Sequence, residues 1–103
     1  MIKINGIEHD FRFSYKALKL FTKQTGLALD QINTLGLEHM DALMWCGLKS
    51  GAEHNKKKFE LTISDCEDLI DNDIALINSV TAALTEDMAK LGEVMNPKKK
   101  GKP

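Results

Sequence analysis

The sequence predicts a mainly helical α+β domain in which an N-terminal β-hairpin packs on four or five helices. Three observations support this fold class: a two-residue turn signal near the N-terminus, several stretches with apolar residues at helical spacing, and a long C-terminal helix of the same kind. The chain of 103 residues suffices for one small domain. We therefore expect a single domain over residues 1–95, followed by a flexible basic tail over residues 96–103.

The hairpin is expected over residues 2–13. Asn5-Gly6 favours a two-residue turn, because both positions can adopt positive φ. The apolar residues of the return strand share one parity, so we expect them to pack on the helices while the polar residues between them face water. These apolar residues are Ile7, Phe11 and Phe13. A two-stranded hairpin is marginally stable alone and needs such a helical layer.

Helical spacing and end signals predict five helices, over residues 15–25, 28–35, 38–50, 64–70 and 73–93. Ser14 can cap the first helix, and Gly26 can end it in the left-handed conformation. Gly51 lies just past the expected end of the third helix. Ser64 and Glu67 have the spacing of a capping box and are expected to begin the fourth.

The last helix carries apolar or neutral residues at alternating steps of three and four, which is typical of a helix packed lengthwise on another helix. They are Ile74, Ile77, Thr81, Leu84, Met88, Leu91 and Met95. Leu76, Val80 and Ala83 widen the apolar surface of the first half, which predicts a place at the centre of the core. Two interpretations remain for the second half: a core helix of one domain, or a surface that docks on another subunit or protein. Methionine suits such a surface because its flexible side chain repacks easily.

Trp45, the only tryptophan, lies on the charged side of its expected helix and not on the apolar stripe. Tryptophan is frequent in binding hot spots and equally common at the boundary of a core, so both interpretations remain. The candidate partner-contact residues are Trp45, Met88, Leu91 and Met95.

Charge is distributed unevenly along the chain. The last six residues contain four lysines, and residues 1–97 contain ten basic residues against fifteen acidic ones. An acidic body is a poor match for phosphates, so we expect no specific nucleic-acid partner. The series Arg12, Lys16, Lys19 and Lys23 is most simply the solvated face of the first helix. No apolar run reaches the ~18–20 residues of a membrane span, and none resembles a signal peptide, so we expect a cytoplasmic protein without a membrane partner.

No motif predicts catalysis, a cofactor or a metal site. The histidines and cysteines lack CxxC or HxxxH spacing, and the cysteines are expected to be reduced. The acidic residues between 65 and 73 lack the glycine and glutamate positions of an EF-hand loop, so helix capping and a solvated face explain them better. GxSxG and phosphate-binding glycine loops are missing too. We expect a non-enzymatic protein.

Two stretches of the chain resemble small phage tail assembly chaperones of the siphophage type. The first covers residues 4–26: a short strand, the Asn5-Gly6 turn, a return strand, and a helix with the family pattern φ-x-A-L-x-x-φ-x-x-x-T-G, here Tyr-Lys-Ala-Leu-Lys-Leu-Phe-Thr-Lys-Gln-Thr-Gly. The second covers residues 43–49, Leu-Met-Trp-Cys-Gly-Leu-Lys, which is similar to the family's L-φ-aromatic-small-G-L stretch. The remainder agrees only in length and helical layout.

The resemblance implies a non-catalytic protein of the host cytoplasm that is absent from the mature virion. It implies binding to the tape measure protein, whose long hydrophobic helices it keeps soluble, and recruitment of the major tail tube protein. It also implies the short product of a frameshifted pair, and Lys98-Lys99-Lys100 can be encoded by an adenine run on which a ribosome can slip. Homo-oligomerisation stays open.

Two alternatives remain. A small virion structural protein, such as a tail completion or connector subunit, would be found in purified particles. A helical regulator associated with nucleic acid would bind duplex DNA in a salt-dependent way.

Overall fold

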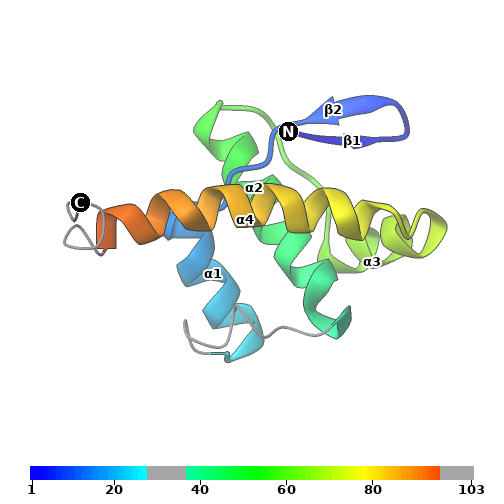
Figure 1. Cartoon of the computed structure of the whole chain (residues 1–103). Helices are drawn as coiled ribbons and strands as arrows, with labels where there is room; N and C mark the ends of the chain where they lie inside the picture. The colour runs from blue at the N-terminus through cyan, green and yellow to red at the C-terminus, as the bar shows by residue number, and fades with distance from the viewer. Residues whose placement is uncertain (28–36, 96–103) are drawn as a thin grey trace.

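The computed structural model describes residues 1–27 and 37–95, the last five of these for their backbone alone (Figure 1). It confirms a mainly helical α+β fold with an N-terminal hairpin and a long C-terminal helix. The elements are β1 (Ile2–Ile4), β2 (Ile7–His9), α1 (Tyr15–Thr25), the 3₁₀ turn η2 (Leu37–His39), α2 (Met40–His54), α3 (Ile63–Asn72) and α4 (Leu76–Met95). The helix expected over residues 28–35 and the tail over residues 96–103 lie outside the described residues.

The hairpin forms at the predicted turn but is shorter than predicted. Strands β1 and β2 are antiparallel, and Asn5 and Gly6 both have positive φ, 52° and 81°. The return strand ends at His9 and not at residue 13. The prediction that Ile7 packs inward is wrong, since its side chain is 64% exposed. The reason is that β1, and not β2, is the strand that lies against α4.

Residues 10–14, which follow β2, cross α2 at very short range as an extended strap. The backbone N–H of Arg12 donates a hydrogen bond to the carbonyl oxygen of Gly47 (3.0 Å). A Cβ on Gly51 would lie 2.7 Å from the backbone carbonyl of Asp10. The expectation that a helix ends before Gly51 is therefore wrong: α2 continues to His54, and this glycine lets the strap pass.

The ends of α1 confirm the prediction from sequence, whereas the start of α3 corrects it. Ser14 caps α1, and Gly26 ends it with φ 76°. The capping box of α3 joins Thr62 and Asp65, two residues earlier than the predicted Ser64–Glu67 pair. Both pairs have the required spacing, but the earlier start places Ile63 in the first turn, where it packs against the core.

The core is assembled around α2, which contacts α1, α3 and α4. The prediction that the first half of α4 lies in the core is confirmed, because Leu76 and Val80 belong to the core and Ala83 packs against it. The predicted series at alternating steps of three and four is wrong in part. The buried residues of α4 are Leu76 and Val80, whereas Thr81 is exposed and Ile74 precedes the helix with its side chain 68% exposed. The inner stripe of α4 is thus rotated away from the predicted series, although Ile77, Leu84 and Met88 pack at its edge. Among the described residues, no helix is long and apolar enough to cross a membrane.

Candidate functional site

Trp45 joins α2 to the connector that precedes α3. Its indole Nε1 donates a hydrogen bond to the carbonyl oxygen of Leu61 (2.7 Å), and its ring lies 6.3 Å from that of Phe59. The ammonium of Lys49 lies within about 6 Å of both rings. The half-buried indole therefore holds the connector on α2, as a residue at the boundary of the core does. A contact of Trp45 with a partner stays a prediction.

The other three candidate residues lie in the second half of α4. Met88 is half-buried and packs against the edge of the core. Leu91 and Met95 belong to the described backbone of α4, and their partner contacts stay predictions. Trp45 and Met88 both pack against the core, and no described hydrogen bond or aromatic contact joins them.

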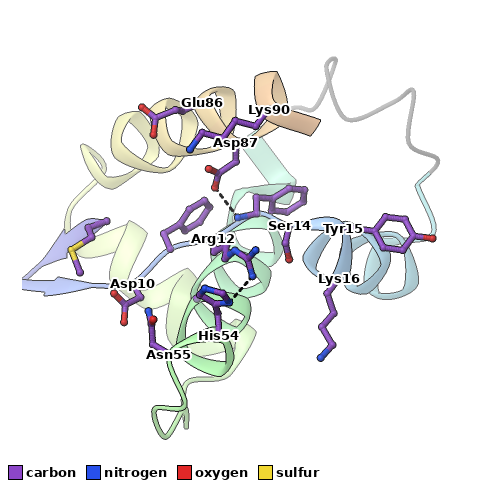
Figure 2. A pocket seen from close by; sticks show the side chains of 14 residues that line it. Asp10, Arg12, Ser14, Tyr15, Lys16, His54, Asn55, Glu86, Asp87 and Lys90 are labelled. Atoms are coloured by element: carbon purple, nitrogen blue, oxygen red, sulfur yellow. Dashed lines mark hydrogen bonds between the residues drawn. The ribbon is translucent and has the colours of Figure 1, made fainter. Parts of the chain in front are cut away.

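An open groove of about 850 Å³ separates the strap and the start of α1 from the second half of α4 (Figure 2). The end of α2 forms its third wall. Charged side chains and one imidazole from all three walls line it: Asp10, Arg12, Lys16, His54, Glu86, Asp87 and Lys90. These segments lie far apart in the sequence, and none carries a motif, so sequence reasoning identified only the basic pair Arg12 and Lys16.

Three polar side chains of the groove, those of Arg12, His54 and Asp87, are engaged with one another or with the backbone. Asp87 Oδ2 accepts a hydrogen bond from the backbone N–H of Phe13 (2.8 Å), which ties α4 to the strap. Arg12 Nη1 donates to Nδ1 of His54 (2.8 Å), an arrangement that requires an unprotonated Nδ1. Asp87, Arg12 and His54 thus connect the walls of the groove.

Asp10 is held at the edge of the groove by the residues after α2. Its carboxylate lies 2.8 Å from the ammonium of Lys57. Hydrogen bonds from Lys57, and to a smaller extent from Asn55, lower the pKa of Asp10 below its usual value. Asp10 is therefore a charged anchor for the strap, and its low pKa does not suit a general acid or base near neutral pH.

A smaller hollow of about 150 Å³ adjoins the groove where the hydroxyls of Ser14 and Ser50 meet at 2.9 Å. His54 lines the same hollow, but its Nδ1 accepts from Arg12, and no described hydrogen bond links it to either serine. The Ser14 hydroxyl also caps α1 by accepting from Ala17. The described contacts thus assign these hydroxyls to the packing of α1 on α2.

The two cysteines are free thiols, as expected, and both are fully buried. Burial raises the pKa of Cys46 and of Cys66 to about 12, so both thiols stay protonated at neutral pH. A protonated thiol is neither a good nucleophile nor a good metal ligand. Among the described residues, no three His, Cys, Asp or Glu side chains are placed to hold a metal ion.

Comparisons of the chain with protein-family models, with curated proteins and with solved structures find no match.

Proposed function

We propose that this protein is a phage tail assembly chaperone. In this proposal it binds the tape measure protein in the host cytoplasm, recruits the major tail tube protein and is absent from the mature virion. It catalyses no reaction. The partners come from the resemblance of residues 4–26 and 43–49 to that family.

The attachment of α4 to the rest of the domain is the observation that carries the proposal. Leu76 and Val80 anchor the start of the helix in the core, and Asp87 ties its middle to the strap. Among the described residues, no hydrogen bond joins α4 to another element after Asp87. The helix nevertheless continues to Met95, about two turns further. A helical end that continues this far beyond its last described hydrogen bond to the domain suits the binding of a partner.

The residues of these turns suit an apolar client. Met88, Leu91 and Met95 recur at steps of three and four, which places them on one side of the helix. A helix of the tape measure protein that lies along this side would bury its apolar face and would be kept from aggregating. Methionine side chains can repack against different client sequences along a long protein.

Co-expression with a helical segment of the tape measure protein tests the proposal. We expect the wild-type chain to keep the segment in the soluble fraction, and Met88→Asp and Met95→Asp to release it into the pellet, because a carboxylate would be buried against an apolar client. Ala89→Asp introduces the same charge at an exposed position of the same helix and should behave as wild type.

Circular dichroism identifies any variant that loses its fold, and Met95→Asp, in the last residue of α4, is the safer of the two. Equal capture by all four proteins, or no capture by the wild type, would contradict the proposal. Trp45→Phe keeps an aromatic ring beside Phe59 and removes the indole N–H. If this variant captures the segment as well as wild type does, the indole N–H takes no part in client binding.

Mass spectrometry of purified phage particles separates the chaperone from a virion structural subunit. We expect peptides of the tail tube protein and of the tape measure protein in the particles, and none from this chain. Stoichiometric recovery of the chain with the particles would favour the structural alternative.

A further inference from the structure

One side of α1 and the adjoining strap carries a concentration of positive charge, which we call the cationic face: Arg12, Lys16, Lys19 and Lys23. All four side chains are exposed. The three lysines follow helical spacing and lie opposite the buried residues Ala17, Leu18 and Phe21. No acidic residue occurs between positions 11 and 27, although the rest of the body is acidic.

The charges of the cationic face are not neutralised inside the domain. Lys49, Lys57 and Lys58 each have a carboxylate within about 3 Å, but no described residue forms an ion pair with any member of the cationic face. The ammonium of Lys19 lies 5.6 Å from the ring centroid of Tyr15, whose side chain is 65% exposed. An exposed aromatic ring among unpaired cations is typical of a protein-binding surface.

The outer side of α3 has the opposite charge, and we call it the acidic face: Glu67, Asp68 and Asp71. These side chains are exposed, on the side of the helix away from buried Cys66 and Ile70. The nearby Asp65 and Asp73 have local roles, because each accepts a backbone hydrogen bond at a helix end. No basic residue occurs between positions 59 and 89, and no described ion pair neutralises the acidic face.

The two faces lie on opposite sides of the domain. Helices α1 and α3 both pack on α2, one on each side of it, and each turns its apolar residues inward (Figure 1). The charged faces therefore point away from α2 in different directions. Each face also has one exposed large hydrophobic beside it, Tyr15 at the cationic face and Ile74, 68% exposed, just after the acidic face.

We propose that the cationic face of one copy of this chain binds the acidic face of a second copy, head to tail. Lysines meet carboxylates across the interface, and Tyr15 and Ile74 supply apolar contact at its edge. Because the two faces lie on opposite sides, each bound pair still presents one free cationic face and one free acidic face. Such a heterologous contact continues into an open chain or closes into a ring. It does not use α4 and is separate from the client site proposed above, although Arg12, Tyr15 and Lys16 also line one wall of the groove.

Charge complementarity favours a second copy over nucleic acid as the partner. Lys16 and Lys23 lie only about 10 Å apart along the helix axis, which is enough to contact few phosphates. The acidic remainder of the body repels a longer polyanion. The acidic face is similarly short, because Glu67 and Asp71 lie about 6 Å apart along their helix axis and Asp68 lies beside them.

Sedimentation velocity on the full chain tests the interface through its dependence on concentration and salt. Exposed ion pairs are individually weak and screened by salt. We therefore expect the sedimentation coefficient to rise with concentration at about 0.03 M NaCl and to return to the monomer value at about 0.5 M. A monomer at all concentrations in low salt would overturn the proposal.

Paired charge reversals identify the surfaces. Lys16→Glu/Lys19→Glu cancels the net positive charge of the cationic face, and Asp68→Lys/Asp71→Lys makes the acidic face weakly cationic, so each double variant alone should be monomeric. An equimolar mixture should associate again into pairs, because the unchanged acidic face of the first variant complements the unchanged cationic face of the second. Lys56→Glu/Lys58→Glu changes the net charge equally on the exposed connector and should associate as wild type. Lys19→Glu/Lys23→Glu is a second reversal of the cationic face, for use if the first does not fold.

Three results would overturn the proposal: double variants that associate as well as wild type, a mixture that stays monomeric while wild type associates, or a wild-type monomer whose sedimentation changes only when duplex or single-stranded DNA is added. Client capture by the second half of α4 is measured separately, so the failure of either proposal leaves the other standing.

Discussion

Helices α2 and α4 are the two longest in the protein, yet they contribute to it in opposite ways. Nine residues of α2 are buried, and the helix contacts α1, α3 and α4. In the described part of α4 the buried side chains are Leu76 and Val80, both in its first half. The domain is thus built around α2, and α4 lies against it with no described hydrogen bond to another element after Asp87. We place the client contact on this less attached half of α4.

Close backbone approach distinguishes the two helices more clearly than apolar content does. Gly47 and Gly51 let the strap cross α2 at a distance that any side chain would prevent. By contrast, α4 meets the strap through a side chain, because Asp87 reaches the backbone N–H of Phe13. The α2 contact therefore tolerates no added atoms, while the α4 contact depends on one hydrogen bond.

Substitutions at the α2 glycines should have the largest effect. The Cβ in Gly51→Ala would meet the backbone of Asp10, and that in Gly47→Ala would overlap the ring of Phe11. We expect each substitution to lower the free energy of unfolding, measured by urea denaturation, by about 1–3 kcal/mol or more. Glu53→Ala, at an exposed position of α2, should change it by less than about 0.5 kcal/mol.

A second substitution shows whether the ring of Phe11 is the obstacle. Phe11→Leu removes the atoms nearest to the added Cβ, so the double variant Gly47→Ala/Phe11→Leu should lose less stability than the sum of the two single variants. Strictly additive losses would mean that another part of the strap limits the contact.

The register of α4 predicts the next largest effect. Val80 is fully buried and Thr81 is exposed. Val80→Ala should cost about 2 kcal/mol of unfolding free energy, because it leaves a cavity in the core, whereas Thr81→Ala should cost less than about 0.5 kcal/mol. Chemical denaturation of both variants checks this. A larger loss of stability for Thr81→Ala than for Val80→Ala would contradict this register and would support the series predicted from the sequence, which contains Thr81.

Loss of the Asp87 side chain should have a smaller effect. Asp87→Ala leaves the backbone N–H of Phe13 without its acceptor and should cost about 1–3 kcal/mol, toward the lower end if water replaces the carboxylate. Glu86→Ala removes an adjacent exposed carboxylate and serves as the matched control. If thermal unfolding curves show the same stability for both variants, the α4 tether does not depend on this hydrogen bond.

The smallest effect concerns the strap in acid. The folded-state pKa of Asp10 is lowered from 3.8, mainly by Lys57, so the ionised carboxylate stabilises the folded state above that pH. This contribution is lost as the pH falls below 3.8 through the lower folded-state value. Lys57→Met should therefore unfold at a lower temperature near neutral pH and lose less stability on acidification. The melting temperature is measured against pH for Lys57→Met and for the control Lys56→Met. Curves that coincide for the two variants would contradict this prediction.

Local signals in the sequence predicted the fold class and several element ends. The Asn5-Gly6 turn, the Ser14 cap and the Gly26 stop depend on backbone preferences of a few neighbouring residues, and all three are present. The end of α2 and the inner side of α4 depend on which segments cross each other. Gly51 is a stop signal by local rules, and the strap makes it part of the helix interior.

The groove could not be predicted, because its walls come from three segments that no motif connects. Arg12 and His54 are 42 residues apart, and Phe13 and Asp87 are 74 apart. Trp45 illustrates the same limit: its spacing allowed a binding surface or a core boundary, and the hydrogen bond to Leu61 depends on the path of the connector.

Hydrogen exchange of the full chain, alone and with a helical segment of the tape measure protein, tests the contrast between α2 and α4 most directly. We predict that in the free protein the amides of α2 exchange slowly and those of α4 after Asp87 exchange much faster, because no described hydrogen bond joins this half to another element. Addition of the client segment should slow exchange in the second half of α4 and leave α2 unchanged. Equal protection of the two helices in the free protein, or no change in α4 when the client is added, would contradict the account.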